Sequence, residues 1–320
     1  MSDASSISQP AAGAWPVMLT PFTTDRRIDW AALDRLIEWY LAADVDGLFA
    51  VCFSSELFHL TSEERLAVAA RTVARVRGRV PVIAAGALGE GDEPLAAAAR
   101  GLADTGVSAV VFLTNQFAAE SQSEPEWCAA AERCLERLDP AIPLGLYECP
   151  LPYKRLLRPS TVLWAARTGR FRFFKDTCCN LVQIEEKIRA LAASPLRFYN
   201  ANTDTLLPSL MVGGHGFSGV GANAVPHLYA WLCRHFRSNP QQAQALQRFL
   251  VESAPAVDLK YPHSVKTYLS LFGVPMEPVC RMREATLETS DLERLRAFHR
   301  AVAGWEEQLG LVSPFALLNR

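Results

Sequence analysis

The sequence predicts an α/β fold: a (β/α)₈ (TIM) barrel followed by a C-terminal helical extension. The first observation is that about eight short β-prone runs alternate with about eight amphipathic helical stretches between residues 15 and 220. The second is that the pattern after Val220 becomes mostly helical. A doubly wound open sheet is the alternative. It would be favoured by a Gly-x-Gly-x-x-Gly turn after the first strand, and the sequence has none there.

The strand candidates are short runs rich in β-branched, aromatic and other apolar residues, as expected for buried strands. In chain order they cover residues 15–19, 47–52, 80–85, 109–113, 143–147, 171–175, 196–200 and 216–220. Their regular alternation with helical windows is the pattern of consecutive βα units, which predicts one barrel rather than several small domains.

Helical windows fill the gaps between the strand candidates, and local signals mark several of their ends. The windows cover residues 30–43, 62–77, 93–104, 124–138, 181–193 and 205–212. Asp29 can cap the first helix, and Thr61 with Glu64 has the spacing of a capping box before the second. Gly106 and Gly169 follow helical windows, where a residue with positive φ is often needed.

After the last strand candidate, four more helical windows predict the appended segment. They cover residues 226–237, 241–254, 265–272 and 291–309, and Ser290 with Glu293 has capping-box spacing at the last one. The predicted organisation is a disordered tail over residues 1–13, the barrel over 14–225 and the helical extension over 226–320. The tail is rich in Ser and Ala and lacks the basic and apolar regions of a signal peptide.

Composition and charge limit the classes of partner. The chain has 320 residues, 50% hydrophobic and 21% charged, and its 32 basic and 34 acidic residues leave a net charge of −2. The charges are interspersed and no apolar run is long enough to span a bilayer, so neither nucleic acid nor a membrane is expected as a partner. The eight cysteines, several in apolar surroundings, indicate reduced thiols and a cytoplasmic protein. Adjacent Cys178 and Cys179 lack Cys-x-x-Cys spacing, so no metal site is expected.

Lys175 is the first candidate for chemistry. It ends a run of alternating aromatic residues, Phe171 and Phe173 among them, that fits a buried strand. Burial removes water from the ammonium group and favours the neutral amine, which is a nucleophile. Lys175 is therefore a candidate Schiff-base lysine that attacks a substrate carbonyl. The alternative is a lysine whose stem packs in the core while its head group stays in water.

Other polar residues end or follow neighbouring strand candidates. In barrels of this kind the active site lies where the strands end. Ser54 and Ser55 follow the second strand candidate, Tyr147 ends the fifth, and Lys175 ends the sixth. A tyrosine can carry protons to and from a carbinolamine oxygen, and serine hydroxyls can hold a carboxylate. For the two serines, hydrogen bonds within the turn are an equally good interpretation.

The order and spacing of several motifs resemble those of the dihydrodipicolinate synthase / N-acetylneuraminate lyase superfamily of class I Schiff-base aldolases and dehydratases. The motifs are Val17-Met-Leu-Thr-Pro-Phe22, Leu60-Thr-Ser-Glu-Glu-Arg65, Phe174-Lys-Asp-Thr177, Gly213-Gly-His-Gly216, Ala222-Asn-Ala-Val-Pro226 and His263-Ser-Val-Lys-Thr-Tyr268. Each motif is weak alone, but together they extend the likeness over nearly the whole chain.

The resemblance implies roles for particular residues. Lys175 would form an imine with a 2-keto acid, and Tyr147 would carry the proton. The loop with Ser54 and Ser55 would bind the keto-acid carboxylate, and Ser218 in the eighth strand candidate is also expected to bind substrate. No cofactor is expected. Such proteins are usually homotetramers built as dimers of dimers, so the chain is expected to be a homo-oligomer, at least a dimer.

The chain departs from the synthases of this superfamily in the loop after the second strand and after the fourth. When the loop is anchored on Glu56, Ser54 takes its second hydroxyl position and Phe53 replaces the first. A one-residue shift would instead put Ser54 and Ser55 in both positions. After the fourth strand, Leu113-Thr-Asn-Gln116 stands where the synthases commonly have a pair of tyrosines.

A third departure follows Tyr147, where Pro152 stands in place of an arginine and Arg155 or Lys154 could take over its role. The expected function is therefore a Schiff-base-forming lyase, an aldolase or a dehydratase, that is not a true dihydrodipicolinate synthase. It would act through Lys175 on a 2-keto acid or a keto-deoxy sugar acid. The alternative is a non-catalytic or regulatory barrel that binds a keto acid or a similar metabolite.

Overall fold

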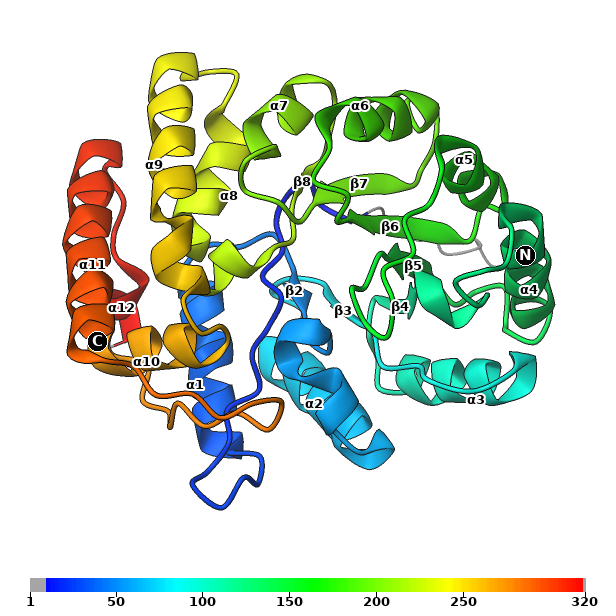
Figure 1. Cartoon of the computed structure of the whole chain (residues 1–320), viewed down its shortest axis with the longest axis horizontal. Helices are drawn as coiled ribbons and strands as arrows, with labels where there is room; N and C mark the ends of the chain where they lie inside the picture. Colours follow the sequence, from blue (N-terminus) through cyan, green and yellow to red (C-terminus); the bar gives the residue numbers. More distant parts are fainter. Residues whose placement is uncertain (1–9, 319–320) are drawn as a thin grey trace.

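The computed structural model describes residues 10–318, and the predicted barrel is confirmed (Figure 1). Eight parallel strands pair in the order β1-β8-β7-β6-β5-β4-β3-β2. They are β1 Gly13–Ala14, β2 Leu48–Phe49, β3 Val82–Ala84, β4 Ala109–Leu113, β5 Leu144–Tyr147, β6 Phe171–Asp176, β7 Arg197–Asn200 and β8 Gly216–Phe217. The first strand lies before the predicted 15–19 run, and β2 and β8 are shorter than expected.

The segment after β1 closes the sheet onto β2. Val17 forms a parallel bridge with Phe49, the amide of Met18 donates to the carbonyl of Phe49 at 2.9 Å, and the amide of Phe49 donates to the carbonyl of Pro16 at 3.0 Å. Pro16 has no N–H, so it cannot take part in a regular ladder on both sides. This explains why the predicted 15–19 strand is an irregular closing segment and the regular pairing falls on Gly13–Ala14.

The predicted N-terminal tail reaches into the described structure. Residues 1–9 lie outside the described residues, but Gly13 already pairs with Gly216 of β8. The carbonyl of Ala11 accepts hydrogen bonds from the indole of Trp15 at 3.0 Å and the hydroxyl of Tyr199 at 2.7 Å. The described end of this segment is therefore hydrogen-bonded to the barrel from Ala11 onward, and strand pairing starts at Gly13, one residue before the boundary predicted at residue 14.

Eight helices alternate with the strands and surround the barrel. They are α1 Trp30–Ala42, α2 Ser62–Val76, α3 Asp92–Ala103, α4 Glu124–Leu135, α5 Pro159–Arg167, α6 Leu181–Ala190, α7 Leu206–Met211 and α8 Pro226–His235. The windows named above omit α5, a nine-residue helix that starts with a proline at its first position. On α8, Tyr229 stacks on Phe217 of β8 at 4.2 Å, so α8 belongs to the barrel and the extension starts at α9.

Helix caps agree with two of the three signals in the sequence. Asp29 accepts a hydrogen bond from the amide of Ala32, and Thr61 and Glu64 form the predicted capping box. The capping box predicted from Ser290 is wrong, because the last long helix is capped by Glu288. The side chain of Asp291 accepts from the amide of Glu288 at 3.1 Å, which places the start of the helix two residues before the predicted one.

The extension consists of α9 Pro240–Asp258, α10 His263–Phe272, α11 Thr289–Leu309 and α12 Pro314–Leu318. Helices α9 and α11 stand side by side on one flank of the barrel (Figure 1), where Phe249 stacks on Phe298 with centroids 6.2 Å apart. Helix α12 returns to the barrel, and its Phe315 lies 5.3 Å from Trp39 of α1. These contacts bury the apolar faces that the sequence pattern had identified.

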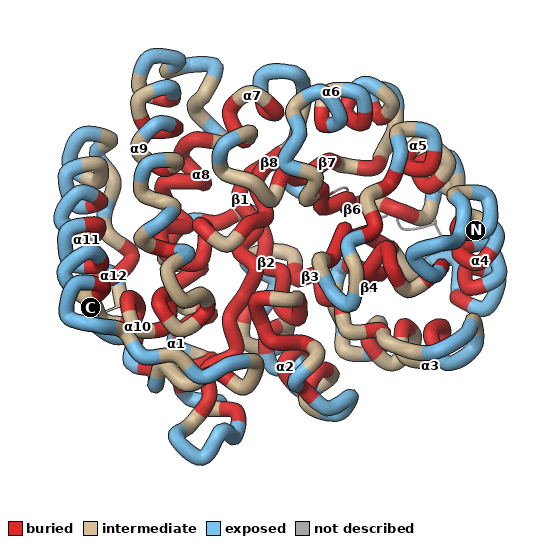
Figure 2. Tube along the Cα trace, in the orientation of Figure 1, coloured by how far each residue is buried: buried red, intermediate tan, exposed pale blue. Residues whose placement is uncertain are grey.

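Aromatic rings fill the inside of the barrel. Phe173 stacks on Tyr199 at 4.3 Å and contacts Trp15 at 5.4 Å and Phe49 at 6.0 Å, and all four residues are fully buried. Figure 2 shows the strands as a continuous buried region inside exposed helices. Each such ring stabilises the fold by roughly 1.5–3 kcal/mol through burial alone. The rings form a rigid floor beneath the ends of the strands.

Four short 3₁₀ helices lie in loops that follow strands. They are η1 Phe53–Ser55, η2 Leu57–His59, η3 Thr114–Gln116 and η4 Val220–Asn223. The first two lie after β2, the third after β4 and the fourth after β8. The predicted site residues of the second-strand loop are therefore held in tight turns rather than in open coil.

Candidate active site

Lys175 lies inside the barrel near the end of β6. Side chains alternate along the strand, so Phe173 and Lys175 face the interior while Asp176 faces the helix outside. The Nζ atom of Lys175 lies 4.3 Å from the ring centroid of Tyr147 and 5.6 Å from that of Phe49. Only 4% of Lys175 is exposed, so the amine is at the inner end of the mouth and not in bulk water.

Burial lowers the pKa of Lys175 to about 8 from an ordinary value of 10.5. Removal of water penalises the ammonium form, and the neighbouring thiols of Cys52 and Cys149 only partly oppose that effect. The aromatic faces also attract the ammonium form. The net result is an amine with a far larger neutral fraction at neutral pH than a lysine in water has. This is the electronic state that a nucleophilic lysine needs.

Tyr147 ends β5 and is the direct register partner of Lys175. Its side chain is 3% exposed, and burial raises the pKa of the phenol well above its ordinary value. The hydroxyl is therefore protonated at neutral pH, beside the thiol of Cys149. A protonated phenol next to a neutral amine can donate a proton to an oxygen that the amine displaces.

The two serines after β2 have different partners. The hydroxyl of Ser55 lies 2.6 Å from the carbonyl of Met18 and 2.9 Å from that of Ala50, and it accepts from the amide of Cys52 at 3.1 Å. These bonds join the segment after β1 to the loop after β2. The hydroxyl of Ser54 instead lies beside the phenol of Tyr261. Ser55 is thus engaged with the backbone, and Ser54 faces other side chains.

Glu56 ties the loop after β2 to the C-terminal extension. It is buried, has a left-handed backbone with φ of 61°, and pairs with the buried ammonium of Lys266 at 2.8 Å. Its other oxygen accepts from the amides of Arg281 and Met282 at 2.6 and 2.8 Å. The C-terminal extension therefore holds the loop that presents Ser54.

Ser218 follows β8 and lies wholly inside the protein. Phe217 faces outward against Tyr229, so strand alternation turns Ser218 inward. Its amide donates to the carbonyl of Asn200 at 2.8 Å. Asn200 is the residue after Tyr199, which is the register partner of Lys175. The side chain of Ser218 is fully buried, and no described residue gives its hydroxyl a hydrogen-bond partner. An unpaired buried hydroxyl is costly unless something else binds it.

The side chain of Arg155 is directed to a different part of the mouth. Its guanidinium donates to the carbonyls of Ala119 and Gln122 at 3.0 and 2.9 Å and pairs with Glu124 at 3.2 Å. Lys154 donates to the carbonyl of Thr177. Both cations thus have backbone partners in the loops around the site, and the structure does not bring Arg155 together with Lys175.

A buried charge cluster lies directly behind the two central residues. Lys187 of α6 donates to Glu148 at 2.8 Å and to Asp176 at 2.6 Å, and all three side chains are at most 1% exposed. Burial opposes the charge on Lys187, but the two carboxylates reverse that effect and raise its pKa. Burial raises the pKa of Glu148. Glu148 also accepts from the amides of Leu157 and Thr177, so the cluster fixes the loops after β5 and β6.

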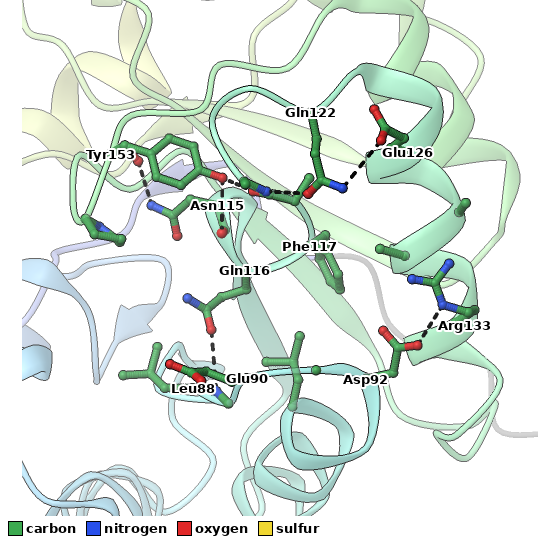
Figure 3. A pocket seen from close by; sticks show the side chains of 18 of the residues that line it. Leu88, Glu90, Asp92, Asn115, Gln116, Phe117, Gln122, Glu126, Arg133 and Tyr153 are labelled. Atoms are coloured by element: carbon green, nitrogen blue, oxygen red, sulfur yellow. Dashed lines mark hydrogen bonds and ion pairs between the residues drawn. The ribbon is translucent and has the colours of Figure 1, made fainter.

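A pocket of about 1210 Å³ opens between the loops after β3, β4 and β5 (Figure 3). It is lined by residues of α3 and α4 and by loops after several strands, and Lys175 and Tyr147 are not among them. Asn115 is at its edge and donates to the carbonyls of Leu151 and Tyr153, both at 2.7 Å. The chemistry described above belongs to the inner mouth, because the reactive amine lies there.

The sequence analysis missed two of the residues around this site. Tyr261 lies in the loop between α9 and α10 and Lys187 on α6, so only the fold brings them near Lys175 or its neighbours. Within residues 10–318, no group of three or more His, Cys, Asp or Glu side chains is placed to hold a metal ion, and no helix is long and apolar enough to cross a membrane.

Comparison with known proteins decides the family. The model of the dihydrodipicolinate synthetase family matches residues 10–301. The chain belongs to this family. It is 28% identical over 291 residues to the 4-hydroxy-tetrahydrodipicolinate synthase of Teredinibacter turnerae, which covers 88% of this chain and 97% of that protein. It is 30% identical to the synthase of Acidithiobacillus ferrooxidans, over 89% of this chain and 96% of that one.

Solved structures of the dihydrodipicolinate synthase family share the fold. A monomeric dihydrodipicolinate synthase variant superposes with a TM-score of 0.83 at 21% identity, covering 97% of this chain and all of the other. A prophage protein of the family from E. coli K12, solved in complex with pyruvate, gives a TM-score of 0.80 at 23% identity over 94% of this chain and 99% of that one. Members of this family are Schiff-base lyases and aldolases of class I that act on pyruvate-like keto acids.

Proposed function

We propose that this protein is a Schiff-base lyase, an aldolase or a dehydratase, that acts on a 2-keto acid or a keto-deoxy sugar acid through Lys175. The observation that carries the proposal is the buried amine of Lys175, 4.3 Å from the ring of Tyr147 and with its pKa lowered to about 8. A structural lysine would keep its head group in water or pair it with a carboxylate, as Lys187 and Lys266 do.

The proposed reaction starts when the neutral amine of Lys175 attacks the keto carbon. The carbonyl oxygen takes up a proton from the phenol of Tyr147 as the carbinolamine forms, and the phenolate takes back the proton that the nitrogen loses. Tyr147 then passes this proton to the carbinolamine hydroxyl, which leaves as water, and a protonated imine and the phenolate of Tyr147 are left. The protonated imine accepts the electron pair that is released when a bond to the carbon next to the imine carbon breaks. The same intermediate therefore serves aldol cleavage and dehydration.

Two serine hydroxyls at the ends of strands support recognition of the rest of the substrate. Ser54 presents its hydroxyl in the loop after β2, and Ser218 presents an unpaired, fully buried hydroxyl from the end of β8. Both are candidates to hydrogen-bond a carboxylate or a substrate hydroxyl. Arg155 stays a weaker candidate, because its guanidinium already bonds to loop carbonyls and Glu124.

Synthase activity is not part of the proposal. Phe53 stands where the synthases have a hydroxyl, and Thr114 and Asn115 stand where they commonly have a pair of tyrosines. In this chain Thr114 donates to the carbonyl of Arg155 at 2.7 Å and Asn115 bonds to loop carbonyls, so both are engaged with the backbone. These departures also favour the second candidate function, a regulatory barrel that binds a keto acid without turning it over.

Borohydride trapping separates the two functions. The protein is mixed with pyruvate and then with other 2-keto acids, reduced with borohydride, and measured by intact mass and peptide mapping. A stable adduct on Lys175, absent from Lys175→Ala, is the result expected for the lyase. No adduct across the panel, together with keto-acid binding in calorimetry, would support the regulatory binder instead.

A further inference from the structure

The hydroxyl of Ser218 faces the inside of the barrel, above the aromatic rings that fill it. Phe217, the residue before it, stacks on α8 outside the sheet, and the amide of Ser218 still bonds to β7. Strand alternation therefore extends to Ser218 and turns its side chain inward. Gly216, the previous inward position of β8, pairs with Tyr199, which in turn pairs with Lys175. Ser218 thus lies one inward position nearer the mouth than the level of Lys175.

The burial of this hydroxyl without a partner is unfavourable for the fold. Ser218 is fully buried, and within residues 10–318 no backbone or side-chain group forms a hydrogen bond with its Oγ. Other buried serines are paired: the hydroxyl of Ser55 lies 2.6 Å from the carbonyl of Met18, and Ser264 donates to the carbonyl of Val257 at 2.7 Å. A buried hydroxyl without such a bond destabilises the folded protein, so the placement of Ser218 points to a role in binding.

The chain segments on both sides of Ser218 carry no charged side chain. Residues 15–17 follow β1 on one side, and residues 199–201 end β7 on the other. Asn200 is turned away from the interior, because its side-chain amide donates to Thr205 at 2.9 Å. A carboxylate placed here would lose its water for a single hydroxyl donor, which is unfavourable. A neutral hydroxyl loses less, and a serine can both donate to it and accept from it.

A substrate bound to Lys175 has to extend toward the mouth. Below the amine, Phe173 stacks on Tyr199 at 4.3 Å and contacts Trp15 at 5.4 Å, and all three rings are fully buried. These packed rings keep a substrate chain from entering the barrel. With the keto carbon held at the amine, the next carbons of the chain lie on the side of Ser218.

We propose that Ser218 is a specificity-determining residue that hydrogen-bonds a hydroxyl on carbon 4 or 5 of a 2-keto acid whose keto carbon is held at Lys175. This deepens the proposed function and rests on it. The substrate class is then the hydroxylated 2-keto acids, among them keto-deoxy sugar acids, rather than unsubstituted ones. An analogue without the hydroxyl leaves Ser218 unpaired in the complex and is therefore used less well.

The test measures the hydroxyl preference, which is the ratio of the rates with a hydroxylated and an unsubstituted probe. The hydroxylated probes are 4-hydroxy-2-oxopentanoate and 5-hydroxy-2-oxopentanoate, and 2-oxopentanoate is the unsubstituted one. The rate is that of borohydride-trapped adduct formation on Lys175 at low probe concentration. Every adduct is counted, because aldol cleavage of the first probe leaves the pyruvate imine on the same lysine.

The preference of wild type for one of the hydroxylated probes should exceed that of Ser218→Ala by about 10- to 100-fold. The rate of Ser218→Ala with pyruvate, which has no such hydroxyl, should stay within about twofold of wild type. This combination assigns the loss to the missing hydrogen bond, because damage to the amine or to Tyr147 would slow the reaction with every probe.

Thermal unfolding separates a binding role of the hydroxyl from a structural one. Ser218→Ala removes no hydrogen bond of the fold, so it should melt at least as high as wild type. Ser264→Ala is the matched control, because it removes the buried bond to the carbonyl of Val257 in the extension. It should melt below wild type and keep the wild-type hydroxyl preference. A Ser218→Ala protein that melts as low as Ser264→Ala would assign the hydroxyl to the fold and overturn the inference.

The kinetic outcomes separate this inference from the proposed function. A hydroxyl preference that is the same in wild type and Ser218→Ala, as expected if the hydroxyl only binds water, would overturn the inference. A pyruvate adduct on Lys175 would still leave the proposed function in place. No adduct on Lys175 with pyruvate or with any of the three probes would overturn both.

Discussion

The reactivity of Lys175 comes from its position above a packed aromatic floor. Phe173 and the other rings of the barrel interior exclude water from the base of the mouth, and the amine is left with ring faces and thiols as neighbours. An amine with its pKa near 8 changes protonation within a convenient pH range. The same burial keeps Tyr147 protonated. One environment therefore prepares both the nucleophile and the acid.

The first prediction is a pH profile for the amine. Imine formation with pyruvate should rise about tenfold per pH unit from pH 6 to 7 and level off above pH 8, because only the neutral amine attacks. The midpoint follows from the lowered pKa of Lys175, which is about 8. The measurement is the rate of borohydride-trapped adduct over that range. A rate that still increases about tenfold from pH 8 to 9 would mean that the amine is solvated like an ordinary lysine.

The second prediction concerns Tyr147. Replacing it by Phe keeps the ring against Lys175 and removes only the hydroxyl, so imine formation should slow by about 10²–10⁴-fold. Thermal unfolding should change little, because the ring carries the packing contact with Phe49. Lys175→Ala is the reference with no adduct at all. A wild-type rate of imine formation in Tyr147→Phe would show that another group donates the proton.

The third prediction separates the two serines. Ser54→Ala should slow turnover and leave the fold intact, because its hydroxyl faces other side chains. Ser55→Ala should instead lower the free energy of unfolding by about 1–3 kcal/mol, because the amide of Cys52 loses its buried acceptor. Denaturant titration and adduct kinetics on both variants measure the difference. Equal, negligible changes in both variants would show that the assumed register or role of the loop is wrong.

At the scale of single elements, the ends of β5 and β6 are held from outside by a buried charge cluster. Lys187 of α6 pairs with Glu148 and Asp176, the residues directly after Tyr147 and Lys175. The residue after Tyr147 and the residue after Lys175 are thus both held by the ammonium of Lys187. The position of the chemistry therefore depends on α6, which contributes no side chain to the mouth itself.

The fourth prediction is a large loss of stability in Lys187→Met. It leaves two buried carboxylates without their cation, which should cost about 3–5 kcal/mol at pH 8. The loss should shrink at pH 5, because burial raises the pKa of Glu148 to about 7 and this carboxyl takes up a proton as the pH falls. Lys260→Met is the control, since its pair with Asp291 is partly exposed and should be worth at most about 1 kcal/mol. Similar losses in both variants would contradict a special role for the cluster.

Local patterns predicted what depends on neighbours in sequence. The strand that ends at Lys175 and the capping box at Thr61 follow from residues a few positions apart, and both are present. The cap at Ser290 failed because Glu288 offers the same geometry two residues earlier. The contacts of Tyr261 and Lys187 could not be predicted, because their partners lie about 38 and 39 positions away and only the closed barrel brings them together.

At the scale of the whole molecule, barrel and extension form one unit. Glu56, in the second-strand loop, receives Lys266 and the amides of Arg281 and Met282 from the extension. Helices α9, α11 and α12 bury much of their apolar faces against one another and against α1. The observed contacts of the extension serve the loop that presents Ser54.

The fifth prediction is that the chain associates at least as a dimer. Because the faces of the extension are largely covered, the exposed apolar side chains are the better candidates for a contact, and Leu151 beside the pocket is 43% exposed. Sedimentation velocity at micromolar concentration should give a species well above 35.2 kDa, the mass of one chain. Leu151→Glu should shift that species toward one chain if this surface takes part, because a buried charge has no partner there. The fold alone does not require association, since a monomeric synthase variant shares it. A wild-type species of 35.2 kDa alone would therefore refute the dimer and leave the barrel and its site unaffected.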